Sequence, residues 1–353
     1  MKPILNVAIL LACLTLPARA EAIGQDSAKA IAAVEAAGGS LKRDKGGHVA
    51  EVSFRGTKID DAPLAHLAGF PKLRSVLLND TKISDAGLAT PGKLTTLNNL
   101  DLRGCQVSNA GIAHLTGLGK LRALRLNGKN GATTVDDGAM VHIAKLKSLK
   151  ALLLDFLFVS GEGLAQLKGL DRLEELYLAS TLVGDEALLV VQQFPRLKKL
   201  RISQTHASDA GLAHLAKIAT LEDLDISQDV KITDAGMQHV AKLKNLKKLN
   251  LWRLSLTDDG IKPLAGLTNL EWLNVDNTRI SDAGLVHLRG MSKLKFLHLG
   301  STGVSDEGLA QLEPLTALKD LKVARTAVTA AGAKKLQGKL KNIKIQLEYI
   351  ENQ

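Results

Sequence analysis

The sequence is poor in cysteine and in aromatic residues. Cys13 and Cys105 are the only cysteines among 353 residues, and aromatic residues make up 3% of the chain. If residues 1–20 are removed, Cys105 alone is left, so the remaining chain forms no internal disulfide. Its stability must therefore come from the packing of aliphatic side chains.

Motifs that carry common chemistry are also missing. The sequence has no HExxH, no GxSxG, no phosphate-binding loop and no close cluster of cysteine and histidine. Neighbouring helices about 8–10 Å apart would keep histidines at equivalent positions too distant to share a metal ion bound at about 2 Å. Those histidines are His66, His114, His142, His214, His239 and His287. We therefore predict that the protein is not an enzyme and holds no cofactor and no metal.

The chain has one long apolar segment, at its start. Residues 4–16 are mostly apolar, Lys2 precedes them, and Ala18-Arg19-Ala20 follows. This pattern is typical of a cleaved secretion signal over residues 1–20, and the segment is too short to span a membrane. We therefore predict an exported protein, periplasmic or extracellular, without a transmembrane segment. A rival interpretation is a lipid anchor at Cys13, because the residues before it partly match a bacterial lipobox.

The rest of the sequence repeats. A unit of about 24 residues occurs twelve times over residues 49–342, and one copy reads LEWLNVDNTRISDAGLVHLRGMSK. The spacing is 24 or 25 residues, except for one spacing of 28 in unit four. The units start at Val49, Leu73, Leu97, Leu121, Leu149, Leu173, Leu197, Leu221, Leu246, Leu270, Leu294 and Leu318. A fixed period of this length indicates a solenoid.

Each unit is predicted to contain one strand and one helix. Apolar residues alternate over 294–299, which is the period of a strand, and Leu309, Leu312 and Leu315 then recur on one helix face. Because a helix returns the chain after every strand, the strands should run parallel in one sheet. The predicted fold class is α/β, a horseshoe-shaped solenoid with a concave sheet and convex helices.

Two recurring polar patterns are interpreted as scaffold. At the turn into each helix, a hydroxyl such as Ser281 suits the N-cap, Asp282 suits the positive end of the helix dipole, and Gly284 allows close approach of the neighbouring helix. At the bend after each strand, a buried ladder of hydroxyls should satisfy backbone groups, interrupted at Leu157 and Leu254. The ladder consists of Thr57, Thr81, Cys105, Thr181, Thr205, Thr278, Thr302 and Thr326.

The pattern L-x-x-L-x-L-x-x-T-x-[IV]-[ST]-D-x-G-L resembles the leucine-rich repeat family over nearly all of the chain after residue 48. Units rich in SDAGL or TDAGL are similar to the 24-residue, helix-bearing repeats of exported bacterial proteins of the planctomycete type and of F-box substrate adaptors. The resemblance implies partner binding and names no ligand.

Both ends of the array need polar covers, since a solenoid exposes an apolar face at each end. Residues 21–48 are predicted to form an N-terminal cap, with an amphipathic helix over Asp26–Ala37 and a hairpin before the first repeat. The twelve repeats then cover residues 49–342, and residues 343–353 are predicted to form a last strand and a tail. The insertion in unit four, within residues 127–138, is expected to bulge outward as a mobile loop.

The chain is basic, with a formal charge of +10 that falls to +8 without Lys2 and Arg19. Many of the basic residues lie at predicted helix C-termini, where they complement the helix dipole. An alternative interpretation is an acidic partner such as an anionic envelope polymer. Nucleic acid is not expected as a partner, because the chain has an export signal and no known nucleic-acid module.

Function is expected on the open face of the sheet, where the repeat does not dictate the side chains. Both tryptophans lie in units nine to eleven, and aromatic residues among polar groups are typical of binding hot spots. The predicted partner-binding residues are Lys248, Asn250, Trp252, Trp272, Asn274, Asp276, Phe296 and His298. The opposing interpretation is that the aromatic side chains only pack on one another.

The sequence thus predicts a non-enzymatic scaffold that binds a protein on its concave sheet. One alternative is an envelope glycan-binding protein that stacks sugars on Trp252, Trp272 and Phe296. Another is a secreted effector or an F-box-like substrate adaptor. Only 28 residues separate the predicted signal from the first repeat, which is short for an F-box helical bundle.

Overall fold

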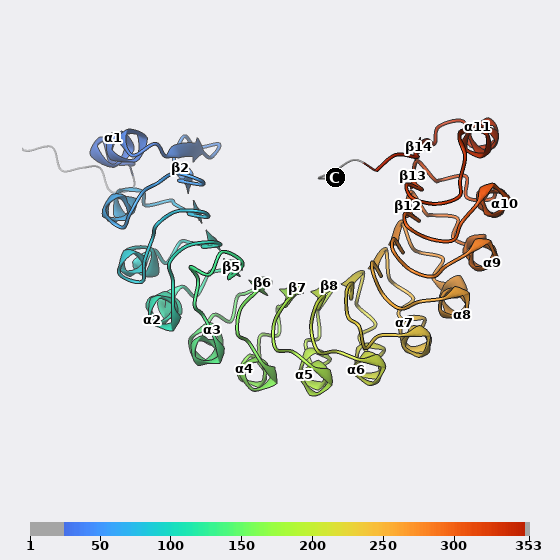
Figure 1. Ribbon diagram of the computed structural model, residues 1–353. Coiled ribbons are helices and arrows are strands. Elements are labelled where there is room, and N and C mark those ends of the chain that lie inside the picture. Colours follow the sequence, from blue (N-terminus) through green and yellow to red (C-terminus); the bar gives the residue numbers. More distant parts are fainter. Residues whose placement is uncertain (1–24, 350–353) are drawn as a thin grey trace, which may run out of the picture.

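The computed structural model describes residues 25–349, which form one arc of stacked repeats (Figure 1). Within these residues, fourteen strands make a single sheet whose strand order follows the chain. The sheet lines the inner side of the arc and the helices line its outer side, so the predicted α/β solenoid is confirmed. The strands are β1 Ser40–Arg43, β2 Val49–Ser53, β3 Ser75–Leu77, β4 Asn99–Asp101, β5 Ala123–Asn127, β6 Ala151–Asp155, β7 Glu175–Tyr177, β8 Lys199–Arg201, β9 Asp223–Asp225, β10 Lys248–Asn250, β11 Trp272–Asn274, β12 Phe296–His298, β13 Asp320–Lys322 and β14 Lys344–Gln346.

Neighbouring strands from β2 to β14 pair in parallel, and each residue faces its counterpart one repeat later, as Leu273 faces Leu297. The first pair differs, because β1 runs antiparallel to β2. The anchor side chains point between the sheet and the helices and are buried. The core is therefore a continuous aliphatic column along the arc, as the shortage of aromatic residues predicts.

The helices on the outer side are short. The α-helices are α1 Ala28–Ala36, α2 Asn109–Ala113, α3 Met140–Ile143, α4 Gly161–Gln166, α5 Asp185–Val191, α6 Asp209–Leu215, α7 Met237–Val240, α8 Asp258–Ile261, α9 Asp282–Leu285, α10 Asp306–Leu309 and α11 Ala330–Lys339. The 3-10 helices are η1 Ala62–Gly69, η2 Ala86–Ala89, η3 Pro91–Lys93, η4 His114–Gly117, η5 Asp137–Ala139, η6 Asp234–Gly236, η7 Lys262–Gly266, η8 Val286–Leu288 and η9 Ala310–Leu312. Repeats one and two contain only 3-10 turns where a helix was predicted, and in repeat two Pro91 follows η2 and removes a backbone donor that an α-helix would need there.

The hydroxyl ladder after the strands is confirmed. Thr181 Oγ1 donates to the carbonyl of Leu178 at 2.7 Å, and the other threonines of the ladder donate in the same way to the carbonyl three residues earlier. Cys105 Sγ donates to the Leu78 carbonyl at 3.1 Å, and burial raises the pKa of this thiol to about 11. Cys105 is therefore a protonated core residue at neutral pH.

The aspartate at the start of most helices contacts the next repeat, a role that the sequence interpretation missed. Asp258 Oδ1 accepts from the Ser281 backbone N–H at 2.8 Å, and Asp258 Oδ2 accepts from the Ser281 hydroxyl at 2.6 Å. The same hydroxyl accepts from the Ala283 N–H and so caps α9 as predicted. We call this series the carboxylate ladder; its other members are Asp61 with Ser84, Asp85 with Ser108, Asp137 with Ser160, Asp185 with Ser208, Asp209 with Thr233, Asp234 with Thr257, Asp282 with Ser305 and Asp306 with Thr329.

The glycine of the same pattern makes room for that carboxylate. A Cβ on Gly284 would overlap the Asp258 carboxylate, and the equivalent glycines meet the aspartate before them in the same way. Repeat five has Gly161 in place of the aspartate. Repeat six then has Gly184 in place of the capping hydroxyl and Ala187 in place of the glycine. The aspartate, the capping hydroxyl and the glycine change together, because all three take part in the same contact between neighbouring repeats.

The insertion in repeat four packs against repeat three, so the expectation that it bulges outward is wrong. Asn130 Nδ2 donates to the Gly104 carbonyl at 3.1 Å. The buried Thr133 donates to the Cys105 carbonyl at 2.8 Å. The inserted residues supply side chains that hold the loop on the neighbouring bend, and the period alone did not reveal this.

The elements expected at both ends of the array are present. Ala30 and Val34 of α1 are buried against the first repeat, and Asp26 Oδ2 accepts from the Val49 N–H at 2.7 Å. At the other end, β14 continues the sheet beside β13. The role of these segments as caps stays a prediction. The predicted signal over residues 1–20, with Cys13, lies outside the described residues.

Candidate binding surface on the concave sheet

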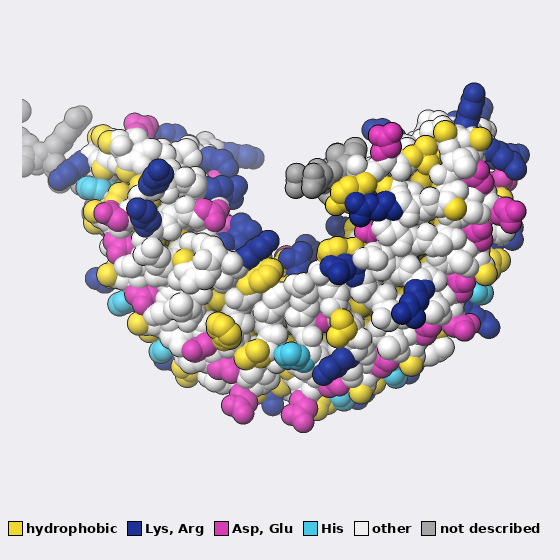
Figure 2. Space-filling model, in the orientation of Figure 1, with side chains coloured by type: hydrophobic (Ala, Val, Ile, Leu, Met, Phe, Trp, Pro, Cys, Tyr) yellow, Lys and Arg dark blue, Asp and Glu magenta, His cyan; other side chains and the backbone are white. Residues whose placement is uncertain are grey.

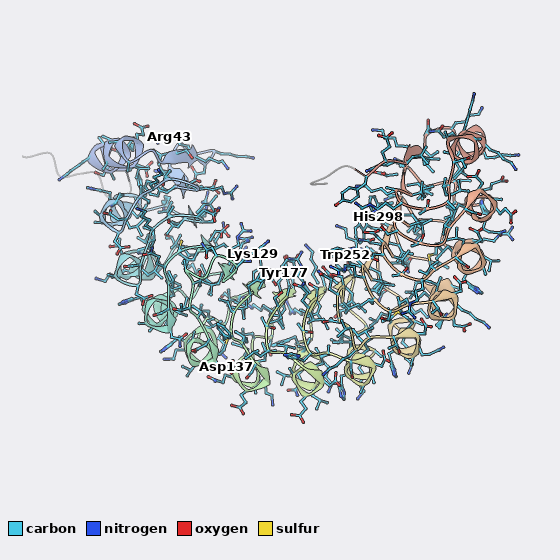
Figure 3. All side chains as sticks on the ribbon, viewed as in Figure 1. Arg43, Lys129, Asp137, Tyr177, Trp252 and His298 are labelled. Atoms are coloured by element: carbon cyan, nitrogen blue, oxygen red, sulfur yellow. The ribbon has the colours of Figure 1, made fainter. Side chains whose placement is uncertain are left out.

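Side chains that alternate with the buried anchors face the open side of the arc. In β11, the outer two residues are partly exposed whereas the central Leu273 is buried. Figure 3 shows Lys129, Tyr177, Trp252 and His298 along the inner side of the arc, on repeats four, six, nine and eleven. The concave sheet is therefore the surface on which the repeats present their variable residues.

Trp272 and Phe296 lie side by side in the register that the period predicts. Their ring centroids are 5.0 Å apart and their planes differ by 5°. Since neighbouring strands are about 4.8 Å apart, the ring faces point along the sheet and the ring edges point outward. On the far side of Phe296, Lys322 Nζ lies 5.8 Å from the ring centroid. The two aromatic side chains pack on one another, and both stay partly exposed.

The eight predicted site residues do not share one pocket. Lys248, Asn250 and Trp272 line a hollow of about 380 Å³ in the middle of the sheet, which we call the central hollow. Three others, namely Trp252, Asp276 and His298, line a separate pocket of about 150 Å³, which we call the C-terminal pocket. The last two, Asn274 and Phe296, lie on the strands between them. The central hollow is lined by residues of strands β7 to β11, whereas most residues of the C-terminal pocket follow strands β10 to β14 at the bends.

The central hollow also contains residues that the sequence interpretation missed. Arg201 lies at its base, with Nη1 at 3.1 Å from Asp155 Oδ2 and Nε at 3.5 Å from Asp225 Oδ2. The guanidinium also lies 4.7 Å from the Tyr177 ring centroid. Burial raises the pKa of Asp155 and of Tyr177, and Arg201 counteracts both shifts. Arg201 thus lies among two carboxylates and one aromatic ring, and these side chains form a polar floor.

In the C-terminal pocket, the side chains of Asp276 and His298 come close to Gly300 because this residue has no side chain. A Cβ at this position would lie 2.8 Å from Asp276 Oδ1 and 2.9 Å from His298 Nε2. Burial lowers the pKa of His298, and the nearby Asp276 carboxylate acts in the opposite direction. Arg325 closes the far side, with its guanidinium carbon 4.0 Å from the ring centroid of Tyr349. This pocket combines aromatic walls with both signs of charge.

A third pocket, which we call the N-terminal pocket, lies over repeats one to four and has a volume of about 470 Å³. The packed insertion forms one of its walls. The pocket is lined by Arg55, Asn79, Asp80, Arg103, Gly104, Asn127, Lys129 and Asn130. Arg55, Asn79, Arg103 and Asn127 occupy the seventh position of their units, which faces the open side of the sheet, and the other four lie on the bends or the insertion that follow. No aromatic residue lies among them, so a search for hot-spot residue types passed over them.

Charges along the edge of the sheet are largely paired. Lys150 Nζ lies 2.6 Å from Glu174 Oε1, and Lys198 Nζ lies 3.7 Å from the other oxygen of the same carboxylate. Lys247 and Lys295 pair in the same way with the glutamate of the repeat before them. Part of the basic clustering in the sequence therefore serves contacts between repeats. Figure 2 shows further blue side chains on the inner side of the N-terminal arm.

Two searches for other classes of site gave no candidate within residues 25–349. No group of three or more His, Cys, Asp or Glu side chains there is close enough to hold a metal ion. Every helix in that range is too short or too polar to span a bilayer.

Comparisons with known proteins agree with the geometry. The family model described as "Leucine Rich repeat" matches residues 93–115 and 290–312. An internalin of Listeria monocytogenes has a similar structure, with 20% identity, a TM-score of 0.63, and coverage of 93% of this chain and 96% of the internalin. A leucine-rich repeat protein of Leptospira interrogans shows 18% identity, a TM-score of 0.55, and coverage of 80% and 74%.

No curated protein sequence matches the chain. At these identities the structural similarity shows the fold alone. The repeat spacing, the parallel concave sheet and the family match at two separate units agree, and this chain has the fold of a leucine-rich repeat solenoid.

Proposed function

We propose that this protein is an exported, non-enzymatic scaffold that binds a protein partner on its concave sheet. The observation that carries this proposal is the continuous concave surface, on which three hollows and the Trp272–Phe296 pair follow one another over thirteen parallel strands. Repeat solenoids use such extended concave surfaces for binding. Partly exposed aromatic residues among charged groups are the residue types that dominate protein interfaces.

The stacking of the two rings favours a protein over a glycan as the ligand. Sugars stack on exposed ring faces, whereas one face of Trp272 and one face of Phe296 are turned toward each other. Arg253 lies 5.6 Å from the Trp252 ring centroid and Lys322 flanks Phe296. The exposed ring edges and the neighbouring charges suit a partner surface that carries both apolar and polar groups.

Replacing Trp272 and Phe296 with alanine should test the binding surface. A pull-down from envelope proteins supplies candidate partners, and the affinity of each purified candidate is then measured for the wild type and the double variant. The variant should lose about 2 kcal/mol or more of binding free energy. Its free energy of unfolding should fall by no more than about 1.5 kcal/mol, the contribution of an aromatic pair.

Two controls accompany this measurement. Leu273→Ala removes a buried anchor on β11, next to Trp272, and should lower the free energy of unfolding by about 2–5 kcal/mol. A glycan array probed with the same sample tests the alternative ligand class. Full affinity of the double variant for an identified protein, or unfolding as severe as in Leu273→Ala, would show that the aromatic pair is not the binding surface.

Export is the second part of the proposal, and it rests on the sequence pattern of residues 1–20. We expect cleavage after Ala20, which leaves Glu21 as the first residue of the mature protein. The intact mass of protein exported from a bacterial host measures this directly. A mass that corresponds to a lipid-modified Cys13 would show that the protein is anchored to the envelope and is not cleaved after Ala20.

A further inference from the structure

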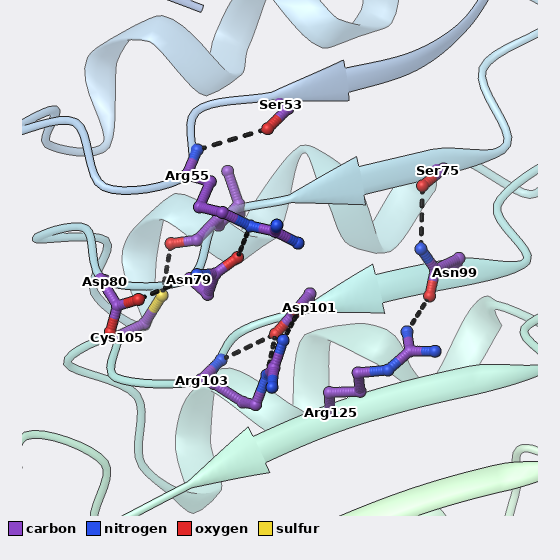
Figure 4. A network of polar contacts seen from close by, with 11 residues as sticks. Ser53, Arg55, Ser75, Asn79, Asp80, Asn99, Asp101, Arg103, Cys105 and Arg125 are labelled. Atoms are coloured by element: carbon purple, nitrogen blue, oxygen red, sulfur yellow. Dashed lines mark hydrogen bonds and ion pairs between the residues drawn. The ribbon is translucent and has the colours of Figure 1, made fainter. Parts of the chain in front are cut away.

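The N-terminal pocket brings three cations together. Figure 4 shows Arg55 of repeat one and Arg103 of repeat three within a network of polar contacts, and Lys129 lies on the packed insertion and lines the same pocket. Asp80 is the single carboxylate in the pocket lining, and Asp101 lies buried behind it. Counting both acids, the site keeps one positive charge in excess.

The two arginines are held in place by their neighbours. Arg55 Nε donates to Asn79 Oδ1 at 2.9 Å. Arg103 forms a bidentate pair with Asp101, with Nε at 2.9 Å and Nη2 at 2.6 Å from its oxygens. This pair raises the pKa of Arg103, so the guanidinium stays charged. Fixed guanidinium groups lose little conformational entropy when they bind an anion.

Donor groups of these cations are unused. The Nη atoms of Arg55 and the Nζ atom of Lys129 form no hydrogen bond or ion pair with any residue from 25 to 349. Lys129 lies against the Phe156 ring, with 5.7 Å between Nζ and the centroid, and this contact leaves its N–H groups open. Unpaired cations at the wall of a pocket favour an anionic ligand.

The remaining lining restricts the kind of anion. An excess of one positive charge balances a carboxylate and undercompensates a dianionic phosphate. Asn79 and Asn130 are held by internal hydrogen bonds to Asp80 and Gly104, whereas Asn127 Nδ2 has no partner among residues 25–349 and can donate to the C=O group of a peptide. The volume of about 470 Å³ lies within the range of ligand pockets. The site therefore fits an acidic side chain together with the backbone that carries it.

We propose that the N-terminal pocket binds the carboxylate of an acidic residue in an extended segment of the protein partner. This inference rests on the proposed function, and it adds the chemistry of the partner. Arg55 and Lys129 supply the free donors, Arg103 supplies a fixed charge, and Asn127 donates to a carbonyl of the peptide backbone. The pocket lies on the opposite arm of the arc from the aromatic pair, so one partner segment would have to extend along the sheet to reach both.

Titration calorimetry with the full mature chain tests this proposal. The probes are a blocked glutamate-rich peptide and the same peptide with glutamine in place of glutamate. The test variant is Arg55→Gln with Lys129→Gln, which leaves the Arg103–Asp101 pair intact. The control variant is Lys217→Gln with Arg289→Gln, which removes the same charge from exposed positions beside the outer helices α6 and η8, away from the concave sheet.

Binding of the glutamate peptide should weaken at least about tenfold in the test variant and stay within about twofold in the control. Asp80→Asn removes the one lining carboxylate and should strengthen binding about threefold or more. Asparagine suits this position, because residue 80 has a φ of 62°. Equal binding of the glutamine peptide, equal losses in both charge variants, or weaker binding in Asp80→Asn would overturn the proposal.

Inorganic phosphate and a polyuronate oligomer serve as probes for other sources of the anion. Either one competing more strongly than the glutamate peptide at this pocket would overturn the assignment to a protein segment. The scaffold proposal is tested separately with an identified partner. If the Trp272 and Phe296 double variant loses affinity while the Arg55 and Lys129 variant keeps full affinity, the scaffold proposal is supported. The proposal that the N-terminal pocket binds a carboxylate is then wrong.

Discussion

Asp229 occupies the bend of repeat eight, where most repeats have a threonine. Its Oδ1 accepts from the Thr205 N–H at 2.5 Å, whereas Oδ2 has no hydrogen-bond partner among the described residues. The side chain is 1% exposed. Burial raises the pKa of Asp229 to about 7, and the nearby Asp225 carboxylate acts in the same direction. A carboxyl group that is neutral in the folded chain at mildly acidic pH ionises as the solution becomes neutral.

This residue should make stability depend on pH. The pKa of Asp229 is raised above the ordinary value of 3.8 in the folded chain, so the folded chain holds this proton more tightly than the unfolded chain. The stability that the bound proton provides is fully present below about pH 4 and is lost as the pH rises to about 7. The free energy of unfolding should fall over that interval, by an amount on the order of 4 kcal/mol at most. Asp229→Asn should remove this part of the slope, as measured by urea unfolding from pH 4 to 8.

The exposed Asp171→Asn serves as the matched control and should leave the slope unchanged. An unchanged slope in Asp229→Asn would mean that Asp229 is ionised at all these pH values and that its Oδ2 atom has a partner such as a buried water.

Among the elements, the start of each outer helix is set by the carboxylate ladder. The aspartate of one repeat binds the capping hydroxyl of the next, and the glycine three residues after that hydroxyl leaves room for the carboxylate. Repeat five has Gly161 in place of the aspartate, and repeat six has Ala187 in place of the glycine. Where the carboxylate is missing, the methyl group of alanine occupies its place. The aspartate, the hydroxyl and the glycine of the repeat pattern therefore form one contact between neighbouring helices. They are not three independent local requirements of a single helix.

Gly284→Ala should destabilise the protein by about 1–3 kcal/mol, because the added methyl group displaces the Asp258 carboxylate. Gly338→Ala in α11 should instead gain about 0.5–1 kcal/mol, since nothing lies within 4 Å of its Cβ position. In an Asp258→Ala background, Gly284→Ala should cost about 1 kcal/mol less. Additive losses in this double-mutant cycle, measured by urea unfolding, would contradict a shared contact.

The insertion of repeat four is the second element with a measurable role. Deleting residues 129–132 restores the spacing of 24 but removes the hydrogen bond from Asn130 to Gly104 and shifts the buried Thr133. We expect a loss of about 1–3 kcal/mol of stability in urea unfolding. Asn130→Ala alone should account for about 1 kcal/mol of it. Unchanged stability after the deletion would restore the interpretation of a free surface loop.

For the whole molecule, we expect stability to depend on covering the ends of the core. Residues 21–48 include α1 and β1, which shield the apolar side chains of the first repeat. Deleting these residues should expose that face and cause dimerisation or aggregation, because solenoid ends need polar covers. Size-exclusion chromatography and calorimetry measure the outcome. A monomer of unchanged stability would contradict the assignment of a cap.

The sequence by itself determined the architecture. Its period fixed the number of repeats, the alternation of anchors fixed the strands and their register, and the threonine ladder followed from local backbone needs at each bend. These features depend on residues that are near in sequence or that recur at the same position, so one unit predicts the next. The register of Trp272 beside Phe296 belongs to this class.

Tertiary structure decided the contacts that join different positions of neighbouring repeats. The pairing of Asp258 with Ser281, the packing of the insertion on Gly104 and the exposed ring edges of Trp272 depend on side-chain directions across about 24 residues of chain. The predicted site is divided between a hollow lined by strand residues and a pocket lined mainly by residues of the bends, and a third pocket forms around Arg55. A repeat pattern gives the side of the sheet that a residue occupies, but the shape of the arc decides which of those residues meet.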